Sequence, residues 1–208
     1  CSSLTEACLP FDTNFAVADL TAFAQLCPGL RSLHMARIAH IDKDELVDFA
    51  KTARNLQTLS FHGNAANVNA DALCCMVAHT PALTSLTLSL FCDVTDTVLG
   101  AIAAGCPKLR ELHTWNAHAT DVGVEALANG CPDLRVLNLA LFRHQTRSSP
   151  CRISDRAISA IVRGCRFLAE LLVSGQMLLT DLSLRELAAH APRLHVLQCT
   201  APARDSSF

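Results

Sequence analysis

A short repeat, of which residues 83–108 are one copy, is the feature that most restricts how this chain can fold. The leucines that open successive units are almost evenly spaced, with one longer gap between Leu134 and Leu168. These marker leucines are Leu4, Leu30, Leu56, Leu83, Leu109, Leu134, Leu168 and Leu194. A unit this short cannot enclose a hydrophobic core alone, so its copies must stack on one another in an extended array.

Each unit combines the pattern of one strand with that of one helix, as residues 83–108 illustrate. Leu86 and Leu88 alternate as in a strand with one buried face. The second half carries apolar residues at the i, i+3, i+4, i+7 spacing of an amphipathic helix, namely Leu99, Ile102, Ala103 and Cys106. Thr95-Asp96 and Pro107 predict the two ends of this helix, because Thr is a good N-cap, Asp complements the helix dipole and proline resists continuation. The same helix start recurs at Thr120-Asp121, Ser154-Asp155 and Thr180-Asp181.

This motif resembles the cysteine-containing class of leucine-rich repeat. It is written L-x-x-L-x-L, then a turn, then (V/I/L)-T-D-x-x-L-x-x-(L/I)-A-x-x-C-P, and it covers the chain from about Leu4 to Cys199. The resemblance implies an α/β solenoid with about eight strands, a parallel sheet on the concave side and helices on the convex side. We expect residues 1–208 to form a single leucine-rich repeat domain that belongs to a longer chain.

Charge and cysteine usage limit the classes of partner and compartment. The formal charge is -2, which provides no global electrostatic reason to expect nucleic acid or an anionic membrane. No apolar run approaches the roughly 18–20 residues that cross a bilayer. Four of the eleven cysteines occupy one slot of the repeat, where free thiols pack as small apolar groups: Cys27, Cys106, Cys131 and Cys165. We therefore expect reduced cysteines and a cytoplasmic or nuclear location, with cytoskeletal association as the alternative.

The strand residues that alternate with the leucines should line the concave face. They are polar and almost uncharged, a composition that suits a protein or peptide partner better than a phosphate backbone. The candidate contact residues on this face are His34, His62, Thr87, Ser89, His113, Trp115 and Asn138. Trp115 is the strongest single candidate, since tryptophan is enriched among interface hot spots. The alternative is that its indole covers the gap left by Thr114, which replaces a strand leucine.

A second candidate surface is the insertion in the unit that begins at Leu134. It carries four basic or titratable residues and no acidic one: Arg143, His144, Arg147 and Arg152. Such a loop could bind an acidic segment, and phosphorylation at Ser149-Pro150 would cancel its charge. The alternative is a solvated loop without function.

The sequence contains no motif that is typical of a metal site or of an enzyme active site. Cys75 and His79 stand at i, i+4 on a predicted helix, but a zinc site needs three or four ligands. The chain has no C-x-x-C, H-E-x-x-H, G-x-S-x-G or phosphate-binding glycine loop. We therefore expect no metal, no cofactor and no enzymatic activity.

The resemblance also implies a function. Cysteine-containing repeats of this kind are similar to those of F-box proteins, in which the repeats bind the substrate of a cullin-type ubiquitin ligase. The expected role is thus non-catalytic protein recognition in a multi-subunit complex. A scaffold or docking subunit of a cytoskeletal or axonemal assembly is the alternative. A small-ligand receptor of the plant hormone type is less favoured, because the concave row lacks basic residues.

Overall fold

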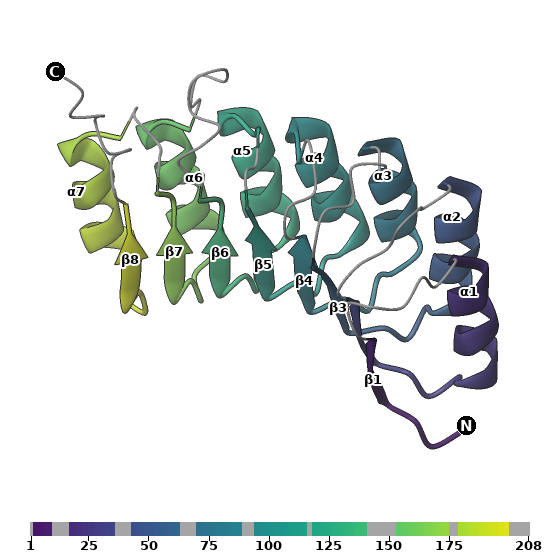
Figure 1. Ribbon diagram of the computed structural model, residues 1–208. Helices are drawn as coiled ribbons and strands as arrows, with labels where there is room; N and C mark the ends of the chain where they lie inside the picture. Colours follow the sequence, from purple (N-terminus) through teal and green to yellow (C-terminus); the bar gives the residue numbers. More distant parts are fainter. Residues whose placement is uncertain are drawn as a thin grey trace, which may run out of the picture.

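The computed structural model is a curved solenoid with one parallel sheet and one layer of helices (Figure 1). It describes residues 2–9, 17–35, 43–62, 70–88, 94–115, 118–140, 153–174 and 179–199. Eight strands lie in the sheet in chain order, and each pairs in parallel with the next. The expected α/β solenoid with about eight strands is confirmed.

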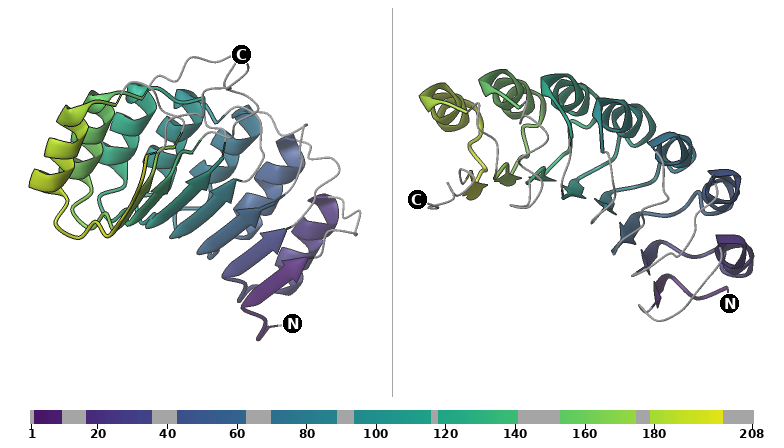
Figure 2. Two further views of the ribbon diagram at one scale, coloured as in Figure 1. Left: turned by 60° about the vertical axis from the view of Figure 1, so that its left-hand side comes forward. Right: turned by 45° about the horizontal axis from the view of Figure 1, so that its top comes forward.

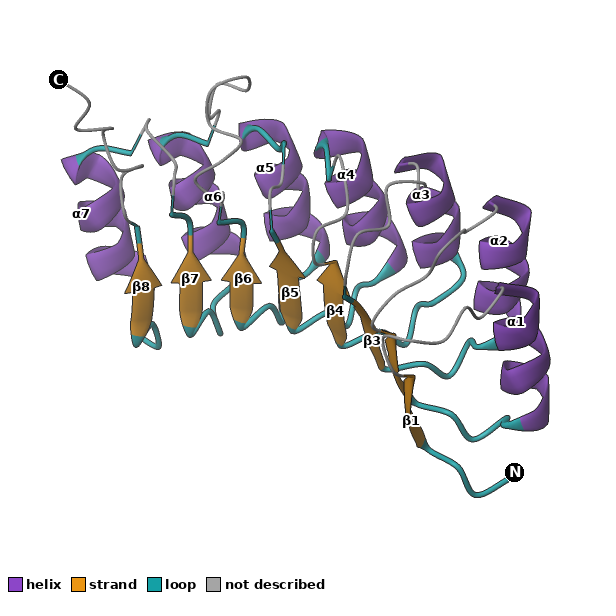
Figure 3. Cartoon of the chain, in the orientation of Figure 1, coloured by secondary structure: helices purple, strands orange, loops and turns teal. Residues whose placement is uncertain are grey.

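Strands and helices alternate along the described chain (Figure 3). The strands are β1 (Glu6–Leu9), β2 (Ser32–Met35), β3 (Thr58–Phe61), β4 (Ser85–Leu88), β5 (Glu111–Thr114), β6 (Val136–Asn138), β7 (Glu170–Leu172) and β8 (Val196–Gln198). The helices are α1 (Val17–Leu26), α2 (Lys43–Thr52), α3 (Ala70–Ala78), α4 (Asp96–Gly105), α5 (Asp121–Gly130), α6 (Asp155–Gly164) and α7 (Asp181–His190).

The register of the sheet places equivalent residues of the repeat directly beside one another. In β2 to β7 the leucine at the middle of the strand faces the helices and is buried, in the row Leu33, Leu59, Leu86, Leu112, Leu137 and Leu171. Parallel strands are about 4.8 Å apart, whereas packed helices need about 8–10 Å, so stacked units must curve with the sheet inside. Figure 2 shows this arc, with the strands on the concave side and the helices on the convex side.

The helix boundaries follow from the capping residues that the sequence indicated. The side chains of Thr120, Ser154 and Thr180 each accept a hydrogen bond from the backbone two residues on, at the start of α5, α6 and α7. Thr95 has the same extended N-cap backbone before α4 but makes no side-chain cap hydrogen bond. The sequence therefore located these helix starts correctly, because a Thr or Ser hydroxyl recurs directly before α4, α5, α6 and α7.

The helices of the described chain are short, and each packs beside the helices that precede and follow it in sequence. Where a Cys-Pro pair follows a helix, the cysteine is the C-cap, and its N–H donates to the carbonyl four residues earlier. The Cys106 N–H, for example, donates to the Ile102 carbonyl at 2.8 Å. Within the described residues, no helix is long and apolar enough to cross a membrane.

Candidate protein-binding face

The concave face is built from the strand residues that point away from the helices. Thr87 of β4, His113 of β5 and Asn138 of β6 are direct neighbours in the register. His34 of β2 and Ser60 of β3 continue the same row toward the N-terminus. The sheet therefore brings these predicted contact residues into one line across the strands.

His113 and Trp115 form an aromatic pair at the end of β5. Their rings are stacked, with centroids 6.2 Å apart and an interplanar angle of 28°. Both residues are half-buried, so neither is fully removed from solvent. The described ring partner of the indole is therefore His113.

Thr114 directly precedes Trp115 in the chain. It lies in the leucine slot of the strand, where it is buried, and its Oγ1 donates to the Asn138 carbonyl at 3.2 Å. The polar side chain is thus satisfied by the neighbouring strand, as a buried hydroxyl requires.

Burial of His113 favours its neutral form. Burial lowers the pKa of His113, and the carboxylates of Glu111 and Glu170 act in the opposite direction without reversing the shift. Glu111 is exposed and also accepts a hydrogen bond from the Ser85 hydroxyl at 2.9 Å. The centre of the concave face therefore combines an aromatic pair with two carboxylates.

The remaining predicted residues differ in how much they can offer a partner. His62 is exposed, Thr87 is half-buried, and His34 is half-buried with its Nε2 3.0 Å from the Ser32 hydroxyl oxygen. Asn138 is only 4% exposed, and its Oδ1 accepts from the Ala140 N–H at 3.0 Å, so it stabilises the turn after β6. Ser89 and the four residues of the insertion lie outside the described residues: Arg143, His144, Arg147 and Arg152.

Comparison with known proteins assigns the repeat. Residues 50–206 match the family described as "FBD-associated F-box protein At5g56370, LRR repeats", which is about three quarters of the chain. The chain belongs to this family of leucine-rich repeats. It is also 31% identical over 205 residues to the "Transport inhibitor response 1-like protein Os05g0150500" of Oryza sativa subsp. japonica, an alignment that covers 95% of the chain and 33% of that protein. The chain thus spans about a third of this relative's length.

Two solved structures share the fold of this leucine-rich repeat domain. An internalin (inlF) from Listeria monocytogenes matches with a TM-score of 0.62 and 14% identity, over 97% of this chain and 57% of the internalin chain. A chain of the TLR13–ssRNA13 complex matches with a TM-score of 0.59 and 17% identity, over 95% of this chain and 29% of that chain. At these identities the likeness concerns the fold alone.

The repeat cysteines belong to the core of the leucine-rich repeat. Burial raises the pKa of the Cys106 thiol to about 12, and the charge of Cys131 adds to this effect. The sulfur of Cys165 donates to the Cys131 carbonyl at 3.3 Å, and Cys131 donates likewise to Cys106. Such thiols are poor nucleophiles and poor ligands at neutral pH. The part of the chain that the structure describes contains no group of three His, Cys, Asp or Glu residues placed to hold a metal ion.

Sequence reasoning missed a set of arginines at the edge of the concave sheet. Arg31, Arg110 and Arg135 each stand one residue before a strand and are exposed. Arg110 and Arg135 lie in adjacent units, since the Arg135 N–H donates to the Arg110 carbonyl at 2.7 Å. The signal was available, because all three residues directly follow a marker leucine. Arg110 and Arg135 directly precede β5 and β6, in the same part of the sheet as the strands that carry Glu111 and Glu170.

Proposed function

We propose that this leucine-rich repeat domain recognises a protein substrate for an F-box-type ubiquitin ligase and binds it on the concave face. Solenoids typically use their curved concave surface for binding. The family match to the repeats of an F-box protein supports the ligase context. The F-box and the adaptor contacts would lie in other parts of the full-length protein.

The observation that carries the binding role is the stacked His113–Trp115 pair in the middle of the concave sheet. A half-buried indole with a fixed neighbour gives a partner a large, rigid apolar contact at low entropic cost. Glu111 and Glu170 beside it, and Arg110 and Arg135 at the sheet edge, supply charged groups of both signs around this centre. An apolar anchor with a polar rim is the usual anatomy of a protein interface.

The described strand residues that point away from the helices include no lysine or arginine. A phosphate backbone or an acidic small ligand would call for such cations within the face itself. This composition favours a protein partner over nucleic acid and over an anionic small molecule.

The experiment is affinity purification of the full-length protein from its own cells, followed by mass spectrometry. Three versions are compared: wild type, Trp115→Ala, and Phe167→Ala as a matched control. Phe167 is an aromatic residue that is 38% exposed, lies between α6 and β7 outside the strands, and packs under Arg193. Its loss removes exposed aromatic surface from a residue outside the concave strands.

Substrate proteins should disappear from the Trp115→Ala sample and remain with wild type and with Phe167→Ala. Cullin and adaptor subunits should remain in all three samples, because they would contact a different part of the protein. A substrate set that is unchanged in Trp115→Ala, with the fold intact by circular dichroism, would refute binding at this face. Absence of cullin and adaptor alongside stable stoichiometric structural partners would refute the ligase role in favour of a scaffold.

A further inference from the structure

Two glutamates of the concave face stand on either side of β6. Glu111 is the first residue of β5 and Glu170 is the first residue of β7, and the register pairs each of them with Val136 of β6. The next residue of each strand is a leucine buried against the helices, so the glutamates belong to the concave row. Strands are about 4.8 Å apart, which separates the two glutamate positions by about 10 Å, with the half-buried Val136 between them.

This position of the repeat is charged here and uncharged in the strands before it. The register partners in β2, β3 and β4 carry hydroxyl groups instead: Ser32, Thr58 and Ser85. The other glutamate at this position in the described sheet is Glu6 of β1, four strands away from β5. Negative charge is therefore concentrated on β5 to β7, where the concave row also carries His113.

The described contacts leave both carboxylates with room for a further hydrogen-bond donor. Glu111 uses Oε2 to accept from the Ser85 hydroxyl at 2.9 Å. Oε1 of Glu170 lies 3.8 Å from Nε2 of His195, and the Glu170 side chain is 38% exposed. Neither glutamate forms an ion pair with an arginine or lysine among the described residues. A carboxylate has about four acceptor sites, so each can still bind a cation.

His113 does not neutralise this charge at neutral pH. Both carboxylates act on its ring, but burial outweighs them and lowers the pKa of His113. On its other side His113 stacks on Trp115. Trp115 follows Glu111 by four residues, a distance of about 13 Å along an extended chain. The same part of the face thus offers a negative region and, about 13 Å along the strand direction, an aromatic surface.

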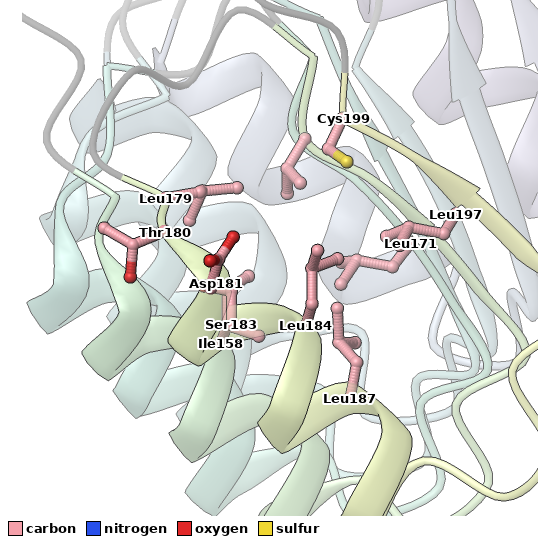
Figure 4. A pocket seen from close by; sticks show the side chains of 11 residues that line it. Ile158, Leu171, Leu179, Thr180, Asp181, Ser183, Leu184, Leu187, Leu197 and Cys199 are labelled. Carbon is pink, nitrogen blue, oxygen red and sulfur yellow. The ribbon is translucent and has the colours of Figure 1, made fainter.

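A cavity at the end of the solenoid has different chemistry. It has a volume of about 330 Å³ and lies between α7 and β8 (Figure 4). Most of its lining is apolar, including Leu184 and Leu197, and Asp181 is the one carboxylate among the described residues that line it. A cation in this cavity would meet a single carboxylate, whereas two face a cation placed over Val136. The concave face is therefore the better site for a basic side chain.

We propose that the protein partner supplies an arginine or lysine that lies over Val136 and binds the Glu111 and Glu170 carboxylates. The same segment of the partner places an apolar side chain on the Trp115–His113 pair. This inference rests on the proposed function, because it names the chemistry of the partner that binds the concave face.

The geometry and the charges of the face both fit this partner. A cation midway between β5 and β7 would lie about 5 Å from each strand, within reach of both glutamate side chains. A guanidinium can donate to two carboxylates at once, and the apolar stem of either basic side chain can pack on Val136. The described concave strand residues include no lysine or arginine, so the partner must supply the cation.

The test starts with a phage-displayed library of random dodecapeptides, selected on the immobilised 208-residue chain. The peptides enriched on wild type should contain an arginine or lysine together with an apolar residue. Their Kd values are then measured by fluorescence polarisation for wild type and for the double variant Glu111→Gln/Glu170→Gln. Loss of charge-assisted hydrogen bonds should weaken binding by about 10-fold or more.

Two comparisons make this result specific. Glu6→Gln is the matched control, because it removes the same charge at the same position of the repeat on β1, and it should leave the Kd unchanged. Replacing the basic residue of the peptide by glutamine should weaken binding to wild type as much as the double variant does. Combining both changes should cost little more than either alone, because both remove the same contact.

Trp115→Ala separates the failure of this proposal from the failure of the proposed function. Peptides that lose binding with Trp115→Ala but keep it with Glu111→Gln/Glu170→Gln would leave the concave face as the binding site and overturn the recognition of a basic residue. Selection that enriches no basic residue would overturn it as well. Binding that is unchanged in both variants and lost with Leu184→Asp would move the site to the end cavity and refute both proposals.

Discussion

Two glycines of α4 should respond in opposite directions to the same substitution by alanine. Gly105 ends the helix where it approaches α3, and a Cβ on this residue would lie 2.5 Å from the Val77 carbonyl oxygen and 2.8 Å from its carbon. Gly100, in the middle of the same helix, has nothing within 4 Å of the position that a Cβ would take. The pair separates the effect of helix propensity from the effect of close packing between units.

The magnitudes follow from this geometry. Gly100→Ala should stabilise the protein by about 0.5–1 kcal/mol, because alanine restricts the unfolded chain and favours the helix. Gly105→Ala gains the same stabilisation from helix propensity and chain entropy. Its methyl group, however, would collide with the backbone of α3, so the two helices must move apart. Overpacking of this kind costs about 1–3 kcal/mol, which outweighs the gain.

The assay is urea denaturation followed by circular dichroism, with the free energy of unfolding compared among wild type, Gly100→Ala and Gly105→Ala. We expect the order Gly100→Ala, wild type, Gly105→Ala from most to least stable. The close approach recurs at the ends of α5 and α6, where a Cβ on Gly130 or Gly164 would meet the carbonyl oxygen of Ala103 or Ala128. A Gly105→Ala variant as stable as Gly100→Ala would refute the reasoning that these glycines set the helix spacing.

Three further predictions concern titratable groups. Measured by NMR, the pKa of His113 should lie below its ordinary value of about 6.5, because burial disfavours the charged form. The stability that neutral His113 contributes should be lost as the pH falls from about 6.5 through the folded-state pKa. Glu111→Gln should lower this pKa further, and an unshifted or raised pKa in wild type would contradict the burial argument. Burial raises the pKa of the Cys131 thiol to about 11, so iodoacetamide should label exposed Cys8 well before Cys131, as mass spectrometry of the folded protein can measure. For Asp155, desolvation raises the pKa, but hydrogen bonds from Ser183 and Thr180 outweigh this effect and leave the pKa lowered. The stability that the Asp155 carboxylate contributes should be present above about pH 4 and lost as the pH falls through the folded-state pKa. Asp155→Asn should remove this part of the pH dependence of the urea midpoint.

The sequence was sufficient for the fold because the repeat carries its information locally. The spacing of Leu86 and Leu88 predicted a half-buried strand, and the structure has one at β4. The hydroxyls of Thr120 and Ser154 marked helix starts, and both cap a helix. Each of these features depends only on neighbours along the chain, so periodicity alone could locate it.

The candidate site was predicted less completely, because side-chain availability depends on contacts between units. Alternation assigned both His113 and Asn138 to the concave face, and the register agrees. It did not predict that Asn138 would be buried with its amide oxygen bonded to Ala140. It also could not predict that Trp115 would stack on His113, since the rotamers of both rings decide that contact.

The period of the repeat by itself determined the solenoid, the order of its strands and the rows of residues that line each face. The tertiary structure decided what the recurring aspartate does. In the sequence, Asp96 is a first-turn acid that complements its own helix dipole. In the folded chain its carboxylate binds the Thr120 N-cap of the next unit. A contact between residues 24 positions apart becomes visible only when stacking brings the two helix ends together, because neither residue meets the other in an isolated unit.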